Sequence, residues 1–304
     1  MTATDTSPAA DADGRLLARI TEQTGQPAVL AGQLSGSILN IVHAVRCDGR
    51  DLIAKYGVAD GASDGIRREA TVLALLADTE VPVAHAVLLP AAPEFPHDLL
   101  LLDLLPGQPA APDSEVLTDA GRSLRRLHEV HAPGFGLVGP GTHGLTGTVD
   151  SWAAVIGAAL DDARQAIPAD VLPTAVHDEA AAQQRQPHIH AHLAGIQHGA
   201  LLHGDLMRRH VWDDHGRLAG LIDWGDAMIG DPLFDLARFS MSGAAAFDKL
   251  RIGYGGPAPD GHVLSFYRMV WSLTALASEC RAGGDWFDSY IETVRRELDL
   301  MPSS

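Results

Sequence analysis

The chain has 304 residues, and 46% of them are hydrophobic, which is ample for the core of one large domain or two smaller ones. Its 22 Lys and Arg stand against 39 Asp and Glu, and the resulting net charge of −17 argues against nucleic acid or an anionic membrane as a partner. This charge would suit a cationic small molecule, although acidic residues also serve solubility alone. No apolar run approaches the roughly 18 to 20 residues of a membrane span.

The N-terminal residues and the cysteines indicate the compartment. Cys47 and Cys280 are too few for a disulfide framework, and the N-terminus has no basic stretch before an apolar core. The sequence therefore predicts a cytoplasmic protein. Residues 1–12 are small and polar, so we expect them to be disordered and the ordered structure to begin at Asp13.

A small antiparallel lobe is predicted next. Apolar residues after Asp13 have helical spacing, and the following β-compatible runs are separated by Gly and polar turns. The predicted strands are 28–34, 39–46 and 51–56. Between the first two, Ser35-Gly36-Ser37 has the small residues that let backbone N–H groups approach phosphate oxygens, although such a glycine is more often a simple turn.

Lys55 is the only lysine of this region and lies in the apolar strand LIAKYG. A helix predicted over about 64–78 has an apolar stripe that leaves Glu69 free to face Lys55. The alternative is a solvated Glu69 that pairs with a neighbouring arginine on the helix surface. Two further strands, 81–90 and 99–105, would complete a five-stranded sheet.

The second lobe is predicted to be mostly helical and to begin at Pro106. The first lobe would then span 13–105 and the second 106–304, with a helical insert at about 150–197. Within this insert we expect helices at 152–167 and 174–196. His188, His190 and His192 lie in an alternating run, but alternate residues do not share a helix face, which favours surface histidines over a metal site.

The densest set of polar residues lies in 201–235. His203-Gly204-Asp205 follows a short apolar run, and two further runs around a turn at 213–216 predict a hairpin that ends near Asp223. The hairpin could bring Asp205 and Asp223 to one point. Phosphoryl transfer needs a group that orients the attacking hydroxyl and carboxylates that hold Mg²⁺ on the phosphates, and these two acids fit. The alternative is a set of ordinary turn and cap residues.

Three motifs in order carry a resemblance to a known family. HGDL at 203–206, IDWGDAMIGDP at 222–232 and DLA at 235–237 together resemble the aminoglycoside phosphotransferase family of the protein-kinase-like superfamily. The resemblance implies an α+β, two-lobed kinase-like fold that uses ATP or GTP with Mg²⁺. Asp231 and Asp235 are interpreted as a helix cap and a loop brace.

The resemblance also implies roles for individual residues. Asp205 is the expected catalytic residue, and Asp223 and His210 are the expected metal ligands. The family commonly has Asn where this chain has His210, and a neutral imidazole is a poorer Mg²⁺ ligand, although macrolide kinases are similar in carrying His there. The nucleotide would contact Ser35, Gly36, Ser37, Lys55, Glu69 and, through backbone groups of the hinge between lobes, Asp103, Leu104 and Leu105.

The acceptor is expected among the C-terminal helices, predicted at 233–247, 263–282 and 286–298. The candidate contacts are Trp271, Glu279, Asp285 and Asp288, each of which could equally be an ordinary helix or loop residue. Asp223 and Asp231 are too close for a long activation loop, which favours a small-molecule acceptor over a protein.

The composition is typical of a high-GC bacterial genome and suggests an antibiotic as the acceptor. The alternatives are a metabolic kinase for a sugar or amino alcohol, and a catalytically silent nucleotide-binding protein.

Overall fold

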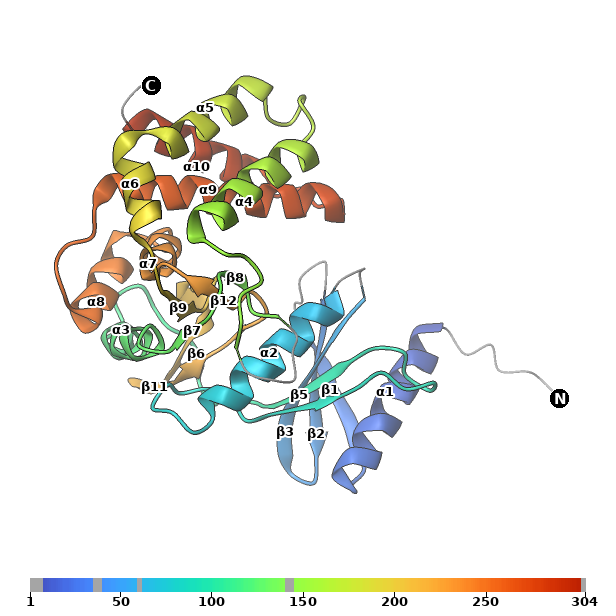
Figure 1. Ribbon diagram of the computed structural model, residues 1–304. Helices are drawn as coiled ribbons and strands as arrows, with labels where there is room; N and C mark the ends of the chain where they lie inside the picture. Colours follow the sequence, from blue (N-terminus) through green and yellow to red (C-terminus); the bar gives the residue numbers. More distant parts are fainter. Residues whose placement is uncertain (1–7, 35–39, 59–61, 140–144, 302–304) are drawn as a thin grey trace.

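The computed structural model describes residues 8–34, 40–58, 62–139 and 145–301, which form two lobes (Figure 1). The small lobe contains one antiparallel sheet with the strand order β1-β2-β3-β5-β4, so the predicted five-stranded sheet is confirmed. Its elements are α1 (Pro8–Thr24), β1 (Ala28–Leu34), β2 (Asn40–Cys47), β3 (Arg50–Gly57), α2 (Ala62–Leu76), β4 (Ala86–Leu89) and β5 (Leu99–Asp103).

Helices α1 and α2 cover opposite faces of this sheet (Figure 1). The side chains of β3 therefore point alternately towards α1 and towards α2. Ala54 and Tyr56 pack with Ile20 of α1 in one core, whereas Leu73 of α2 belongs to the other. Because successive strand residues point to opposite faces, Lys55 points towards α2. The sheet therefore aims this lysine at the helix that carries Glu69.

Helix α1 begins earlier than expected. The predicted disordered segment ended at residue 12, but the helix starts at Pro8. Proline is well suited to the first helical position because its missing N–H needs no partner there, and the alanines that follow are strong helix formers.

The large lobe contains most of the helices and two small sheets, β11-β10-β6 and β7-β9-β12-β8. The predicted hairpin is confirmed as β10–β11, with positive φ at His215 and Gly216 in its turn. The elements are β6 (Gln108–Pro109), α3 (Val116–Leu127), β7 (His131–Ala132), β8 (Gly136–Leu137), α4 (Trp152–Ala166), α5 (Thr174–Arg185), α6 (Pro187–Gly195), β9 (Gly199–Leu202), the 3₁₀ turn η1 (Arg208–His210), β10 (Val211–Asp214), β11 (Arg217–Leu221), β12 (Met228–Gly230), α7 (Pro232–Ser240), α8 (Ala244–Tyr254), α9 (Gly261–Ala282) and α10 (Phe287–Leu300).

Two predicted helices are in fact broken. The helix expected over 174–196 is divided into α5 and α6 at Pro187, because the residue before a proline is forced out of the helical region, and Gln186 has an extended ψ of 134°. The helix expected over 233–247 is divided into α7 and α8 at Gly243, whose φ of 105° is outside the helical range.

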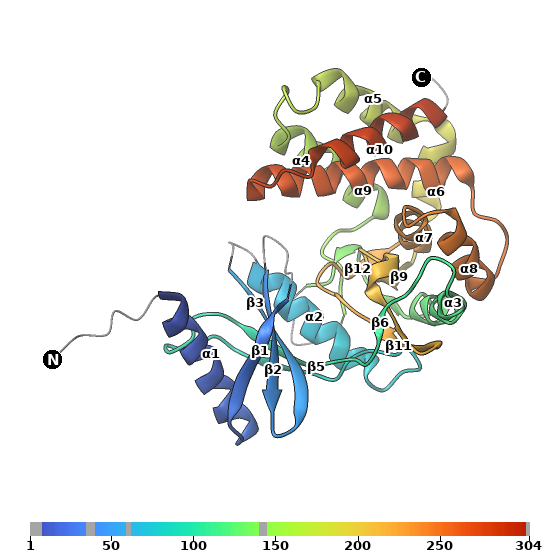
Figure 2. The same ribbon diagram turned by 180° about the vertical axis from the view of Figure 1, so that it is seen from behind.

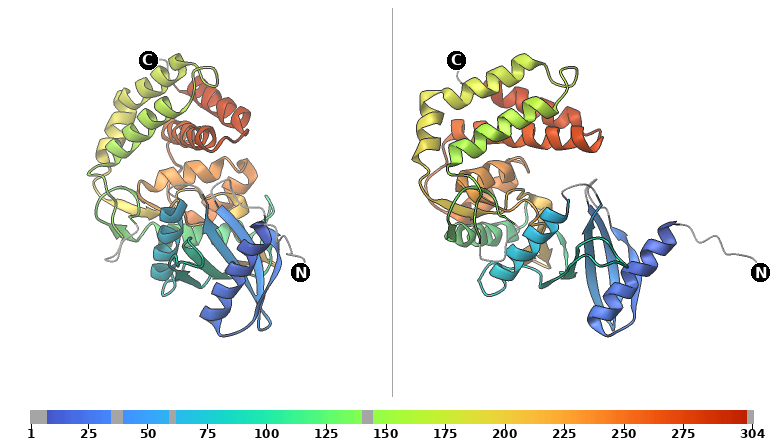
Figure 3. Two further views of the ribbon diagram at one scale, coloured as in Figure 1. Left: turned by 90° about the vertical axis from the view of Figure 1, so that its right-hand side faces the viewer. Right: turned by 45° about the vertical axis from the view of Figure 1, so that its right-hand side comes forward.

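The insert helices α4, α5 and α6 pack against α9 or α10 and form one layer with them at the end of the large lobe remote from the small lobe (Figures 2 and 3). Asp231, at the N-terminus of α7, joins this layer to the rest of the lobe. It caps Leu233 N–H at 3.0 Å and accepts hydrogen bonds from Tyr267 Oη and His192 Nε2, both at 2.6 Å. The predicted cap role of Asp231 is confirmed.

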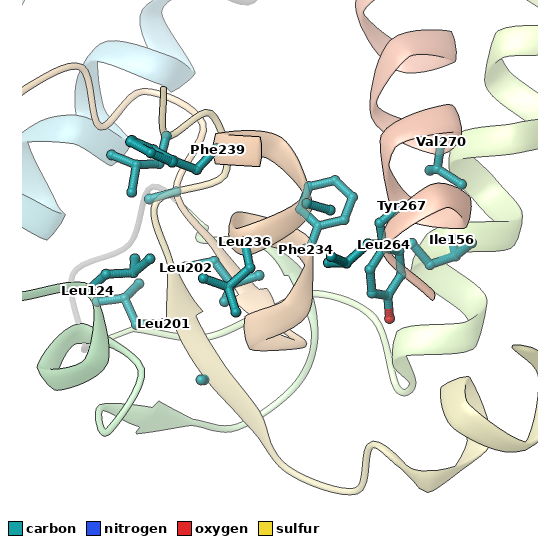
Figure 4. Packing of buried hydrophobic residues seen from close by; sticks show 14 of the residues in the cluster. Leu124, Ile156, Leu201, Leu202, Phe234, Leu236, Phe239, Leu264, Tyr267 and Val270 are labelled. Carbon is teal, nitrogen blue, oxygen red and sulfur yellow. The ribbon is translucent and has the colours of Figure 1, made fainter. Parts of the chain in front are cut away.

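The core of the large lobe connects this layer to the small central sheet. Leu201 of β9, Phe234 and Phe239 of α7, and Tyr267 of α9 are buried in one continuous cluster (Figure 4). Within the described residues, no helix is long and apolar enough to cross a bilayer.

Helices α3 and α8 pack backbone against backbone. A Cβ on Gly121 would overlap the carbonyl of Leu250, and a Cβ on Gly253 would overlap the carbonyl of Thr118. Both helices need glycine here because any side chain would separate them.

We therefore expect Gly121→Ala to lower the free energy of unfolding by about 1–3 kcal/mol or more, because the added methyl has no space. Gly195→Ala is the matched control, because no described atom lies within 4 Å of its new Cβ. Alanine normally gains up to about 1 kcal/mol over glycine in a helix, so the control should show no loss. Urea unfolding measures both, and equal stabilities of the two variants would contradict this packing.

Candidate functional site

Lys55 lies between two carboxylates where the lobes meet. Its Nζ is 2.7 Å from Glu69 Oε2 and 2.7 Å from Asp223 Oδ1. The side chain of Lys55 is 10% exposed and that of Asp223 is 47% exposed, so the aspartate remains accessible to a ligand. The predicted pairing of Lys55 with Glu69 is present in the structure.

The charges of this group fix one another. Burial alone would lower the pKa of Lys55, but the carboxylates of Asp223 and Glu69 outweigh it and raise that pKa above its usual value. In return, the positive charge of Lys55 holds the pKa of Asp223 well below its usual range. The lysine is therefore a permanent cation and Asp223 a permanent anion near neutral pH.

Helix α2 is also bound directly to the segment after Asp223. Trp224 N–H donates to Glu69 Oε1 at 3.3 Å, and Arg68 donates to the carbonyls of Gly225 at 2.6 Å and Val138 at 2.8 Å. Two adjacent residues of α2 thus hold the large lobe. The Trp224 indole is fully buried and packs on the ring of His203 at 4.5 Å.

Asp235 braces the loop that carries Asp205. Its fully buried carboxylate accepts from the N–H groups of His203 at 2.7 Å and Gly204 at 2.9 Å, and His128 Nε2 lies 3.2 Å away. Gly204 has a φ of 85° and leaves no room for a Cβ, because that atom would overlap the carbonyl of Asp226. The predicted bracing role of Asp235 is confirmed.

His210 lies between the backbone of Asp205, the predicted catalytic residue, and Asp223, a predicted metal ligand. Its Nδ1 is 2.8 Å from the Asp205 carbonyl oxygen, and its Nε2 is 3.7 Å from Asp223 Oδ2. Because only Nδ1–H can donate to a carbonyl, Nε2 carries the lone pair. Burial lowers the pKa of His210 to about 4, so the ring is neutral near pH 7. Arg209 Nε donates to the same Nε2 at 3.1 Å.

The sequence interpretation missed two residues of this site. Asp226 lies near Asp205 and Asp223, and desolvation together with the charges of these two acids raises its pKa to about 6. Arg238 Nε lies 2.6 Å from Asp205 Oδ1. A sequence signal existed for Arg238, because it is three residues beyond Asp235 and residues at that spacing share a helix face.

Two of the three backbone N–H groups at the predicted hinge are hydrogen-bonded within the protein. The N–H of Asp103 donates to His85 O at 2.9 Å, and that of Leu104 donates to Asp51 O at 3.1 Å. Among the described residues, no acceptor binds the N–H of Leu105, and Pro106 supplies no N–H. Of these three amides, only that of Leu105 is available to a nucleotide base. Ser35, Gly36 and Ser37 lie outside the described residues.

The predicted acceptor residues differ in their surroundings. The Trp271 ring lies against Arg238, with the guanidinium carbon 3.4 Å from the ring centroid, and its other ring neighbour is Tyr290 at 6.1 Å. Glu279 is eight residues further along α9, about 12 Å away at the rise of a helix. One of its carboxylate oxygens is buried and has no described hydrogen-bond partner. Asp285 and Asp288 are exposed, and Asp288 shares a shallow hollow with other α10 residues.

The histidine run is not a metal site in the described part of the chain, where no group of three His, Cys, Asp or Glu is arranged to hold an ion. His190 is exposed, and His188 pairs with Asp260 at 3.1 Å. His192 differs from the expected surface residue, because it is partly buried against Asp231.

The sequence pattern of APH, the phosphotransferase enzyme family, matches residues 31–267, which is most of the chain. The chain belongs to this family. It is therefore a kinase-like phosphotransferase that acts on a hydroxyl group of its acceptor. No curated protein sequence matches the chain.

Solved structures show that this phosphotransferase has the fold of aminoglycoside kinases. The aminoglycoside phosphotransferase APH(4)-Ia has a TM-score of 0.73 and 18% identity, with 94% of this chain and 97% of that chain covered. A putative fructosamine-3-kinase from Thermobifida fusca has a TM-score of 0.65 and 23% identity, with 93% and 98% covered. APH(2")-IIia, in complex with GDP and kanamycin, has a TM-score of 0.66 and 18% identity, with 93% and 98% covered.

Because Asp235 braces the loop that carries Asp205, we expect its substitution to lower the stability of the protein. Asp235→Asn should lower the free energy of unfolding by about 3 kcal/mol, because an amide nitrogen would face buried N–H donors. Burial alone would raise the pKa of Asp235, but hydrogen bonds from His128 and His203 lower it. The free energy of unfolding of the wild type should thus exceed that of the variant by the full amount above about pH 4. This excess should shrink as the pH falls through the lowered pKa of Asp235.

Asp260→Asn is the control, because Asp260 caps α9 at the surface, asparagine caps equally well, and the exposed pair with His188 contributes little. Urea unfolding between pH 3 and 7 measures both variants. A loss that is equal in the two variants, or independent of pH in Asp235→Asn, would contradict the bracing role.

Proposed function

We propose that the chain transfers the γ-phosphoryl group of ATP or GTP to a hydroxyl group of an antibiotic. The observation that carries the proposal is the position of Lys55 and Asp223 at the lobe junction, with His210 bound to the Asp205 backbone carbonyl and 3.7 Å from Asp223. In the proposal, Lys55 is the phosphate-binding cation, Asp223 the metal-binding carboxylate and Asp205 the hydroxyl-orienting carboxylate, which is supported by the influence of both aspartates on the pKa of Asp226. The donor class is supported by the ADP and AMP-PNP complexes of a thermostable mutant of APH(4)-Ia.

In the proposed reaction, Lys55 holds the α- and β-phosphates and Glu69 holds Lys55. The Leu105 N–H binds the base. The acceptor oxygen bonds to the γ-phosphorus while the bond from that phosphorus to the β,γ-bridging oxygen breaks, and the electron pair leaves with the nucleoside diphosphate. The hydroxyl proton passes to the Asp205 carboxylate.

The residues around Asp223 fit a magnesium ion in part. Asp223 offers a hard, permanently charged oxygen, and phosphate oxygens and water commonly complete the shell of Mg²⁺ when the protein gives only one or two carboxylates. When bound, the ion would neutralise charge on the transferred phosphoryl group. His210 offers the Nε2 lone pair only if Arg209 Nε first turns away from it.

The choice of an antibiotic acceptor is supported by two structural relatives. A mutant of APH(4)-Ia binds hygromycin B, and APH(2")-IIia binds kanamycin. A second candidate acceptor class is the sugar-derived amine, which is favoured by the likeness to a putative fructosamine-3-kinase at 23% identity. The two classes share the same chemistry at Asp205.

A panel assay tests this function. Purified protein, Mg²⁺ and ATP or GTP are incubated with antibiotics of several classes, sugars and amino alcohols, and mass spectrometry detects the addition of one phosphoryl group. A phosphorylated antibiotic supports the proposal, and transfer only to sugars or amino alcohols would assign the chain to metabolism. Nucleotide binding without any transfer would favour the catalytically silent protein.

Asp205→Asn should lower the transfer rate by about 10²–10⁴-fold, because the amide cannot accept the acceptor proton. Nucleotide binding should be retained. The matched control is Asp214→Asn on the β10–β11 hairpin, where the only described ion-pair partners of the side chain are Arg217 and His215. Transfer by Asp205→Asn within a few-fold of the control would refute the assignment of Asp205.

Asp223→Asn should remove the dependence of nucleotide affinity on Mg²⁺, because the charged metal-binding oxygen is lost. Calorimetric titration of ATP with Mg²⁺ and with EDTA measures this dependence in both proteins. The wild type should bind more tightly with Mg²⁺, whereas the variant should give the same affinity in both solutions. A full magnesium effect in the variant would show that Asp223 is not the ligand.

A further inference from the structure

Arg238 of α7 is the only ion-pair partner of Asp205 among the described residues. Its Nε donates to Asp205 Oδ1 at 2.6 Å. The Arg238 side chain is 5% exposed and that of Asp205 is 16% exposed. A charged pair in this position is screened little by solvent, so its geometry is strongly constrained.

The guanidinium of Arg238 is also held on its other sides. Its central carbon lies 3.4 Å from the ring centroid of Trp271, which is within the range of a strong cation–π contact. One terminal nitrogen is 3.2 Å from Met207 Sδ, and the other is 3.9 Å from Met241 Sδ. The planar group therefore lies between an aromatic face and two thioethers, with its Nε directed at the carboxylate.

This arrangement distinguishes the two oxygens of Asp205. Oδ1 is bound by Arg238, whereas Oδ2 has no described hydrogen-bond partner. The Asp205 backbone is fixed separately, because its carbonyl accepts from His210 and the preceding N–H groups are bound by Asp235. The loop and the side chain thus have independent supports, and the side-chain support leaves one oxygen for the acceptor.

We propose that Arg238 is a positioning residue that fixes Asp205 Oδ1 so that Oδ2 orients the acceptor hydroxyl, and that Trp271 acts by holding Arg238. The inference rests on the proposed role of Asp205. It changes the interpretation of Trp271, since the ring face that would have formed a wall of the acceptor pocket is covered by the guanidinium. Trp271 then affects the rate without touching the acceptor.

The alternative is an ion pair that only stabilises the large lobe. Such a pair would affect folding in proportion to its burial, and its loss would leave the rate of the folded enzyme unchanged. The two possibilities therefore differ in kcat measured on folded protein. The two possibilities also differ in whether added guanidinium restores the rate of an Arg238 variant. A free guanidinium can replace a positioning group but cannot restore a lost backbone arrangement.

The experiment compares Arg238→Met, Arg238→Lys, Arg238→Ala and Trp271→Leu with the control Arg268→Met. Arg268 is a partly buried arginine of α9 that binds Ser240 Oγ at 2.7 Å and Glu297 at 3.2 Å, with no contact to Asp205. The substrate is the acceptor that the panel assay identifies, or water if only nucleotide hydrolysis is found. Circular dichroism and calorimetry give the folded fraction and the nucleotide affinity of each variant.

We expect Arg238→Met to lower kcat by about 10²-fold, the effect of a misplaced catalytic group, while the nucleotide Kd stays within about twofold. Arg238→Lys should retain more activity than Arg238→Met, and Trp271→Leu should lie between wild type and Arg238→Met. Added guanidinium at tens of millimolar should raise the rate of Arg238→Ala at least several-fold, whereas equal sodium chloride should not. Arg268→Met should keep the wild-type kcat.

A kcat for folded Arg238→Met within about threefold of the control would overturn the proposal, as would guanidinium rescue no greater than that by sodium chloride. If Arg238→Met does not fold, Trp271→Leu decides, because it leaves both members of the ion pair in place, and an unchanged kcat then overturns the positioning role. A wild type that neither transfers nor hydrolyses nucleotide would instead overturn the proposed function itself.

Discussion

The fold depends on a lysine that is buried between two carboxylates from different parts of the chain. A buried charge without partners costs several kcal/mol, so Lys55 of β3 is stable only when Glu69 of α2 and Asp223 after β11 are both in place. The sheet, its covering helix and the loops of the large lobe are thereby held in one relative arrangement. Arg68 and Trp224 extend the same contact through backbone groups.

The sequence alone predicted the parts of this arrangement that depend on local periodicity. Alternation in β3 and the apolar stripe of α2 were enough to pair Lys55 with Glu69, and the turn at His215 was enough for the hairpin. Pro187 was a sequence signal for the break between α5 and α6, but the apolar pattern continues on both sides of it and led to the prediction of a single helix. The spacing of Arg238 from Asp235 places both on one helix face, but it does not identify Asp205 as the partner of Arg238, because Asp205 lies 33 residues earlier and the contact exists only after α7 docks on the loop.

The overall charge of the chain is a poor guide to the reacting centre. The net charge of −17 suggests a site for cations, yet the carboxylate of Asp205 is paired with Arg238, and Arg209 binds the side of His210 that faces Asp223. An acceptor amine close to the reacting hydroxyl would meet these guanidinium groups. The net negative charge of the chain can therefore attract a cationic acceptor as it approaches, but it contributes less to the contacts that the bound acceptor makes.

Helix α7 has only nine residues, yet side chains at its start, middle and end each bind a different part of the large lobe. Asp231 binds the outer helical layer, Asp235 binds the loop before Asp205, and Arg238 binds Asp205 itself. A single inserted or deleted residue would rotate the later side chains by about 100° and break two of these connections. The length of α7 therefore has to match the spacing between the outer helical layer and the loop that carries Asp205.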